Sequence, residues 1–86
     1  MPEHRTFQAR VWNCMPAFQV PHATARSLRV WGPDDIGTQI RRRRDVIYRG
    51  SAHLTSGTEV RSGAAIKHLR KGELISVTVW RLTTRN

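Results

Sequence analysis

The 86-residue sequence predicts a mainly β fold, either a small antiparallel sheet or a closed barrel, with about five strands and at most one short helix. An α+β arrangement is the alternative. Ile, Val and Thr make up 20 of the 86 residues, and their β-branched side chains suit a pleated sheet. In addition, apolar and polar residues alternate with a period of two near the C-terminus. A chain of this length folds as one domain, which we place at residues 1–86.

The clearest strand is expected at residues 73–82. Two sets of side chains alternate there, namely Ile75, Val77 and Val79 on one face and Ser76, Thr78 and Trp80 on the other. A second strand is expected from Thr6 to Cys14, with Phe7, Ala9 and Val11 on one face. A short return strand at residues 17–20 precedes Pro21, and a third candidate at residues 26–31 points Leu28 and Val30 the same way and ends at Gly32.

The stretch GTQIRRRRDVIYRG, residues 37–50, is compatible with two structures. As a helix it would begin at Asp34 or Asp35, place Ile36, Ile40 and Ile47 on one side, and stop at Gly50. As a strand it would alternate Ile40, Arg42, Arg44, Val46 and Tyr48 with the other residues. We favour a strand at about residues 44–49, preceded by a loop or helical turn. In either structure, at least two of the four arginines must face solvent or an anion.

Residues 62–72 predict a two-turn helix. Ser62 is the expected N-cap, and Gly72 ends the helix behind Arg70 and Lys71. Its apolar side would consist of Ala65, Ile66 and Leu69.

Three short motifs give another view of this region: Val60-Arg-Ser-Gly63, Leu69-Arg-Lys-Gly72 and Ile75-Ser-Val-Thr-Val79. In this order they resemble half of a bacterial SH3-like domain, over residues 55–80. The resemblance covers under a third of the chain, and the sequence stops soon after Trp80, where such domains have further strands. It implies an SH3-like barrel, in which residues 65–69 would form a strand in place of the helix.

The charge of the chain points to anionic partners. Lys and Arg number 15 against 6 Asp and Glu, for a net charge of +9, and thirteen of the fifteen cations are arginine. Arginine presents a planar set of donors that binds phosphate bidentately and stacks on bases. Codon bias in a GC-rich genome is the other explanation for the arginine excess. Whatever the origin of the arginine excess, a small protein with this net charge attracts polyanions.

These features lead to our first hypothesis, a small nucleic-acid-binding module with weak sequence selectivity, for DNA or RNA. Tyr48 and one of the three tryptophans are candidate stacking groups, while at least two tryptophans are expected in the core. The expected phosphate-binding residues are Arg41, Arg42, Arg43, Arg44, Arg49, Arg70 and Lys71.

The second hypothesis belongs to another class, a protein-interaction module. The chain would be an accessory or structural protein of phage or plasmid type, which docks on an acidic protein surface or inhibits a host nucleic-acid-handling complex. A small domain with a marginal core suits such a role, because an assembly would stabilise it.

Other functions find little support in the residues. No enzymatic activity is expected, because neither an activated nucleophile nor a phosphate-binding glycine loop is evident, and capping and charge balance account for the few acidic residues. The histidines and Cys14 are scattered, so we expect no metal and no cofactor. With no apolar segment long enough to cross a bilayer and no signal peptide, the expected location is the cytoplasm, or the host cytoplasm for a viral or plasmid-encoded protein.

Overall fold

A computed structural model describes residues 4–11, 17–32, 36–55, 57–63, 66 and 69–82 of the chain. Within these ranges the fold is mainly antiparallel β with one short helix, which confirms the predicted fold class. The elements in chain order are β1 (His4–Arg10), β2 (Ala17–Gln19), α1 (His22–Trp31), β3 (Ile36–Arg42), β4 (Asp45–Leu54), β5 (Glu59–Ser62) and β6 (Leu74–Arg81).

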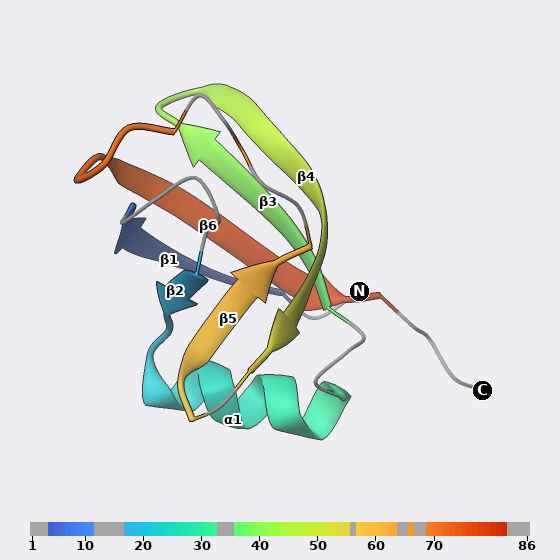
Figure 1. Ribbon diagram of the computed structural model, residues 1–86. Coiled ribbons are helices and arrows are strands. Elements are labelled where there is room, and N and C mark those ends of the chain that lie inside the picture. The colour runs from blue at the N-terminus through green and yellow to red at the C-terminus, as the bar shows by residue number, and fades with distance from the viewer. Residues whose placement is uncertain are drawn as a thin grey trace.

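The six strands form one sheet in the order β1-β6-β3-β4-β5-β2. The sheet curls until it is nearly closed, so that its two edge strands β1 and β2 approach each other, and α1 lies across one end below β2 and β5 (Figure 1). Every paired neighbour is antiparallel. The β3–β4 hairpin and the loop before β6 project at the end of the sheet away from α1 (Figure 1).

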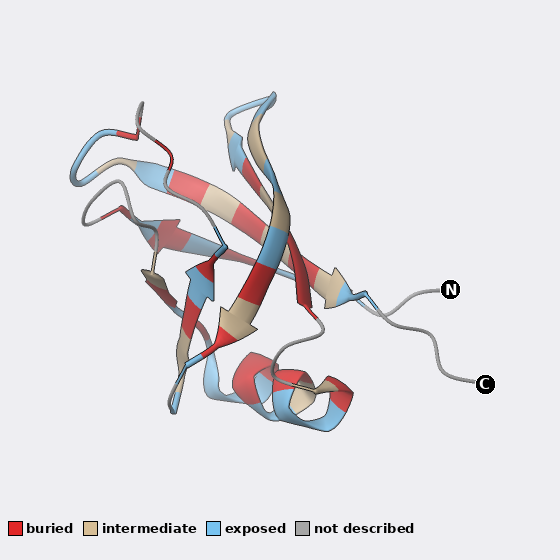
Figure 2. Cartoon of the chain, turned by 45° about the vertical axis from the view of Figure 1, so that its right-hand side comes forward, coloured by how far each residue is buried: buried red, intermediate tan, exposed pale blue. Residues whose placement is uncertain are grey.

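The hydrophobic core lies inside the curl, and the strands reach it with every second residue (Figure 2). In β6 the alternation is the one that the sequence predicts, because Ile75, Val77 and Val79 are buried while Ser76 and Thr78 are only partly covered. In β1 the inward residues are likewise the predicted ones, Phe7, Ala9 and the following Val11. Trp12 and Cys14, expected in the same strand, lie outside the described residues.

The strand expected at residues 26–31 is wrong, because these residues belong to α1. Leu28 is fully buried and Val30 is 83% exposed, so the two side chains do not share a face. The buried residues of α1 are Thr24, Ala25, Leu28 and Trp31, a spacing typical of one face of a helix. Gly32 ends the helix with a φ of 114°, and its N–H donates to the Leu28 carbonyl at 3.0 Å.

The helix expected at residues 62–72 is also wrong for the part of it that is described. Ser62 ends β5 instead of capping a helix, and residues 71–72 form a turn before β6. Ile66 and Leu69 are buried as predicted, and the Leu69 N–H donates to the Ile66 carbonyl at 3.3 Å. The SH3-like resemblance implied a strand at residues 65–69, but neither Ile66 nor Leu69 lies in a strand. Ala65, Lys67 and His68 lie outside the described residues.

The central stretch is a β-hairpin, and its helical interpretation is wrong. The strand favoured at residues 44–49 exists as the first half of β4, but it is preceded by a second strand, β3, and not by a loop or helical turn. The pairing of Arg42 with Asp45 leaves a two-residue turn, Arg43-Arg44. The register shifts between Ile40 and Arg41, so that β4 contains one extra residue, a β-bulge, beside the turn.

Candidate functional site

The hairpin distributes the four consecutive arginines over three positions. Arg41 lies on the outer side of β3, opposite Ser76 of β6 and Val46 of β4. Arg42 follows the buried residues Ile36 and Ile40 on the inner side, where it lies beyond the end of the core. Arg43 and Arg44 form the turn itself and are exposed. Therefore the chain reversal keeps all four arginines near one end of the sheet while three of them are exposed.

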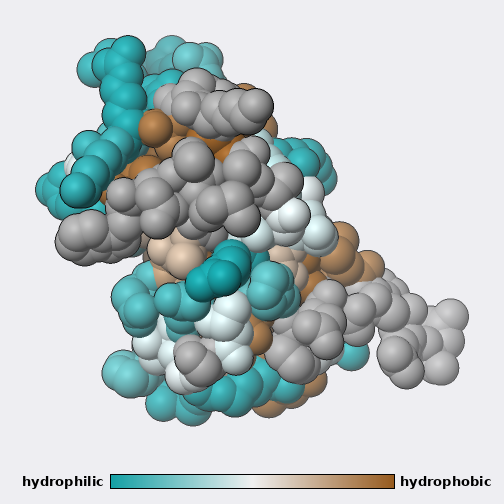
Figure 3. Space-filling model, viewed as in Figure 1, coloured by the Kyte–Doolittle hydropathy of each residue, from teal (hydrophilic) through white to brown (hydrophobic). Residues whose placement is uncertain are grey.

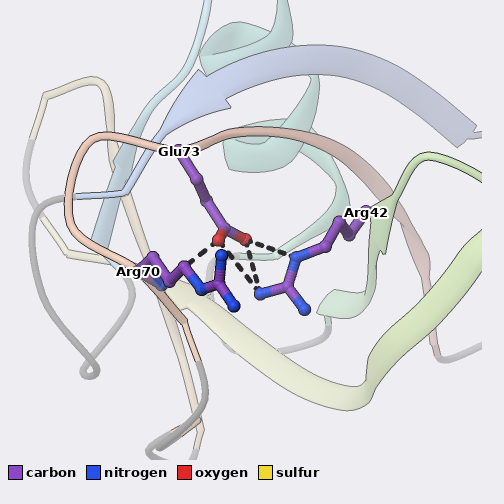
Figure 4. A network of polar contacts seen from close by, with 3 residues as sticks. All are labelled: Arg42, Arg70 and Glu73. Atoms are coloured by element: carbon purple, nitrogen blue, oxygen red, sulfur yellow. Dashed lines mark hydrogen bonds and ion pairs between the residues drawn. The ribbon is translucent and has the colours of Figure 1, made fainter.

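One ion pair joins the hairpin to the loop that precedes β6 (Figure 4). The Arg42 guanidinium donates from Nη2 to both carboxylate oxygens of Glu73, at 2.8 and 3.0 Å, and from Nε to Oε1 at 3.0 Å. The second oxygen of Glu73 also accepts from the backbone N–H of Arg70 at 3.2 Å. This bidentate contact holds the two segments together although they are far apart in the sequence.

We call the cations of these two segments the hairpin cluster, which consists of Arg41, Arg42, Arg43, Arg44, Arg70 and Lys71. A shallow groove of about 470 Å³ runs between the segments, lined by Arg42, Arg43, Asp45, Arg70, Glu73 and Leu74. Only two carboxylates, Asp45 and Glu73, accompany the six cations among the described residues of these segments. In the space-filling view, hydrophilic residues gather where the hairpin and the loop project (Figure 3). The cluster therefore carries a net positive charge at the surface.

Arg43 adopts an unusual backbone conformation. Its φ of 56° lies in the left-handed region, which favours glycine, and Arg43 is the one non-glycine residue with positive φ within the described ranges. A two-residue hairpin turn commonly has glycine, asparagine or aspartate where φ is positive. An arginine there costs about 1 kcal/mol relative to glycine.

Arg49 does not belong to the hairpin cluster. It lies on the outer side of β4, paired with Gln39 of β3, and its Nη1 donates to the Gln39 Oε1 at 2.8 Å. Its guanidinium lies over the ring of Trp80, 4.8 Å from the ring centre. Of the arginines of the central run, only Arg41 shares this side of the sheet. Strand geometry places the Cα atoms of Arg41 and Arg49 roughly 8 Å apart.

The outer face of the sheet brings together residues that are not adjacent in the sequence. We define it by the outward residues of β1, β6, β3 and β4: His4, Thr6, Gln8, Arg10, Gly37, Gln39, Arg41, Val46, Arg49, Ser51, His53, Leu74, Ser76, Thr78 and Trp80. None of these described residues is acidic. Arg10 adds a cation that is not among the predicted phosphate-binding residues, and its Nη1 donates to the Gly72 carbonyl at 3.0 Å, next to Lys71. The outer face and the hairpin cluster meet at Arg41.

The aromatic residues divide between core and surface. Trp31 of α1 is buried, with the guanidinium of Arg5 5.7 Å from its ring centre. Tyr48, a candidate stacking group in the sequence, is half-buried against the core, and its hydroxyl donates to the Ser51 carbonyl at 3.3 Å. Of the two tryptophans that the structure describes, Trp80 is the one on the outer face, where it is partly buried, and its alternation with Ser76 and Thr78 is the sequence signal for that position.

Among the residues that the structure describes, no group of three or more His, Cys, Asp or Glu side chains converges as metal ligands. No helix in the described ranges is long and apolar enough to cross a membrane.

Comparison with known proteins finds no family model, no curated protein and no solved structure that matches the chain.

Proposed function

We propose that the chain is a small nucleic-acid-binding module that contacts phosphates through the hairpin cluster. The observation that supports this most strongly is the gathering of six cations on two segments joined by the Arg42–Glu73 pair. Arginines on ordered elements lose less side-chain and backbone entropy on binding than arginines in a free tail. They therefore form a prepared site for a chain of phosphates.

The cations of the cluster have different roles in this proposal. Arg41, Arg43, Arg44 and Lys71 are exposed and can bind phosphates directly. Arg42 is bound to Glu73, so it holds the hairpin in place and adds to the local potential. Arg70 lies between these roles, because its backbone N–H is bound to Glu73 while its side chain lines the groove.

The proposed binding has weak sequence selectivity. Arginine and lysine contacts to phosphates position a nucleic acid without reading its bases. Affinity that comes mainly from phosphate contacts falls steeply with salt, because bound counterions are released on binding. Salt dependence is therefore the property that tests the proposal most directly.

The test compares the salt dependence of binding in two variants of equal charge. The variant Arg41→Ala/Arg43→Ala/Arg44→Ala removes the exposed arginines of the hairpin and leaves the Arg42–Glu73 pair intact. The control, Arg26→Ala/Arg61→Ala/Arg81→Ala, removes three exposed arginines from α1, β5 and β6. Binding to a labelled oligonucleotide is measured by fluorescence anisotropy over a series of salt concentrations.

We expect the hairpin variant to reduce the slope of log affinity against log salt by about 2–3 units, since each phosphate contact contributes about 0.7–0.9. The control should keep a slope close to that of the wild type. An equal loss in both variants would mean that only the net charge matters, and it would contradict a site at the hairpin. Polyglutamate serves as the competitor, and displacement of the oligonucleotide at equal charge concentration would favour docking on an acidic protein instead.

A further inference from the structure

The outer face of the sheet contains a recess beside Trp80. It has a volume of about 340 Å³ and is lined by His4, Gln39, Arg49, Thr78 and Trp80. These residues come from four neighbouring strands, so the recess forms only when β1, β6, β3 and β4 pair in this order. It lies outside the groove of the hairpin cluster, with which it shares no lining residue.

The ring of Trp80 packs against a glycine on the neighbouring strand. Gly37 pairs with Trp80, and a Cβ at residue 37 would overlap Cε2 and Nε1 of the indole and lie 2.6 Å from Cζ2. The indole therefore lies against the backbone of β3, where only a glycine leaves room for it. A ring packed in this way loses little freedom when a ligand contacts it.

Arg49 covers the indole on the side away from Gly37 and adds a second planar group. The Arg49 guanidinium lies over the ring, and its hydrogen bond to the Gln39 side chain helps to orient it there. We call Gly37, Gln39, Arg49 and Trp80 the Trp80–Arg49 platform. Both the indole and the guanidinium are planar groups on which nucleobases stack. The remaining guanidinium donors can at the same time bind a phosphate.

We infer that the Trp80–Arg49 platform stacks an unpaired base, so that the ligand of the proposed function is a single-stranded nucleic acid. The inference rests on that proposed function. A duplex covers the faces of its bases by stacking them on one another, whereas a single strand can present a base to a protein ring. The outer face suits such a strand because its described residues carry arginines and no carboxylate.

The position of Arg41 connects the platform to the hairpin cluster. Arg41 lies on the same face, roughly 8 Å from Arg49 by strand geometry, and continues into the exposed turn arginines. A single strand bound along this line places one base on the platform and its neighbouring phosphates on the arginines. The platform would then determine the preference for single strands, and the hairpin cluster would determine the salt dependence.

The test measures two ligands with two substitutions of the same residue. The ligands are labelled oligothymidylate, a single strand without base pairing, and a DNA hairpin whose stem has the same number of phosphates and whose two strands are joined by a non-nucleotide linker, so that it presents no unpaired base. In Trp80→Leu the ring is removed but the apolar contact with Gly37 is kept; in Trp80→Phe an aromatic ring is kept. Both variants leave the hairpin cluster unchanged, so the salt slope serves as a control within the same protein.

We expect Trp80→Leu to weaken oligothymidylate binding roughly 5- to 150-fold, the range typical of one stacked base. The salt slope and the affinity for the DNA hairpin should stay near the wild-type values, and Trp80→Phe should lose less than Trp80→Leu. An equal loss for both ligands, or no loss for either, would overturn the inference while the proposed function stands. A wild-type protein that binds neither ligand at low salt would overturn both.

A second measurement uses the wild-type chain and does not depend on the stability of a variant. The indole N–H signal of Trp80 in an NMR spectrum is assigned by its loss in Trp80→Phe. Oligothymidylate should shift this signal more than those of the other two tryptophans, and the DNA hairpin should leave it in place. A Trp80 signal that oligothymidylate does not move at saturation would contradict stacking at the platform.

Discussion

At the scale of single residues, Arg43 shows a conflict between local conformation and charge. Its positive φ is one that glycine adopts without cost, yet the residue carries an exposed cation. Backbone strain at a surface turn persists only where other interactions hold the chain in place or the side chain is needed. The neighbouring Arg44 has no positive φ and provides a direct comparison.

We predict that Arg43→Gly and Arg44→Gly differ in stability but not in their effect on binding. At Arg43, glycine relieves strain of about 1 kcal/mol, which offsets the entropy that glycine adds to the unfolded chain. At Arg44, only the entropic cost of about 0.5–1 kcal/mol remains. Urea denaturation should therefore find Arg43→Gly the more stable protein, while both variants lose affinity for the oligonucleotide to a similar degree. Equal stabilities would show that the turn carries no strain at Arg43.

At the scale of elements, the hairpin and the loop before β6 act as one unit because Glu73 binds both. The side chains of Arg42 and Glu73 are 36% and 16% exposed, and their contact is bidentate. The second ion pair in the described residues, between Arg61 and Glu59, is longer at 3.5 Å and more exposed, at 50% and 32%. A well-aligned and partly buried pair contributes more to stability than an exposed one.

Replacing the glutamate by glutamine should therefore destabilise the fold to a different extent in the two ion pairs. Glu73→Gln should lower the free energy of unfolding by about 1 kcal/mol, because the four hydrogen bonds that Glu73 accepts lose the carboxylate charge and one acceptor oxygen becomes an amide NH₂ group. Glu59→Gln should change it by less than about 0.5 kcal/mol. Both substitutions raise the net charge by one, so the comparison in urea denaturation isolates the contact from the total charge. A larger loss in Glu59→Gln would show that the Glu73 contact does not hold the two segments together.

At the scale of the whole molecule, α1 closes one end of the curled sheet and completes the core. Three of its side chains, Ala25, Leu28 and Trp31, belong to the same buried cluster as the inward residues of the strands. A domain of this size buries a modest fraction of its surface, so each such side chain matters to its stability. The opposite side of the helix, which includes Val30, faces solvent.

Because α1 covers the core with only one of its faces, two apolar residues that are two positions apart should contribute very differently to the free energy of unfolding. Leu28→Ala should lower the free energy of unfolding by about 2–5 kcal/mol, because the removed atoms leave a cavity in the core. Val30→Ala should change it by about 0.5 kcal/mol or less, since the side chain is already in water. Thermal unfolding followed by circular dichroism measures both variants. Similar losses would favour the strand that the sequence suggested, in which the two residues share a face.

Much of the fold could be predicted from the sequence, since it depends on local alternation. The inward residues of β1 and β6 follow from a period of two that any pairing partner would preserve. The position of the helix does not follow from local alternation, because Leu28 and Val30 by themselves also match a strand pattern, and only the buried Thr24 and Ala25 complete the helical spacing. The hairpin was missed because its turn consists of arginines and lacks the glycine or asparagine that usually marks such a turn.

By itself, the sequence determined that this protein is a small, basic, mainly β domain, because composition and short-range periodicity decide charge and the side of each strand that is buried. Only the tertiary structure decided which cations lie together. Strand pairing separated Arg42 from Arg41, brought Glu73 to the hairpin, and placed Trp80 beside Arg49 across β3. Such neighbours depend on register between segments far apart in the chain, and register is set by long-range packing that no local pattern contains.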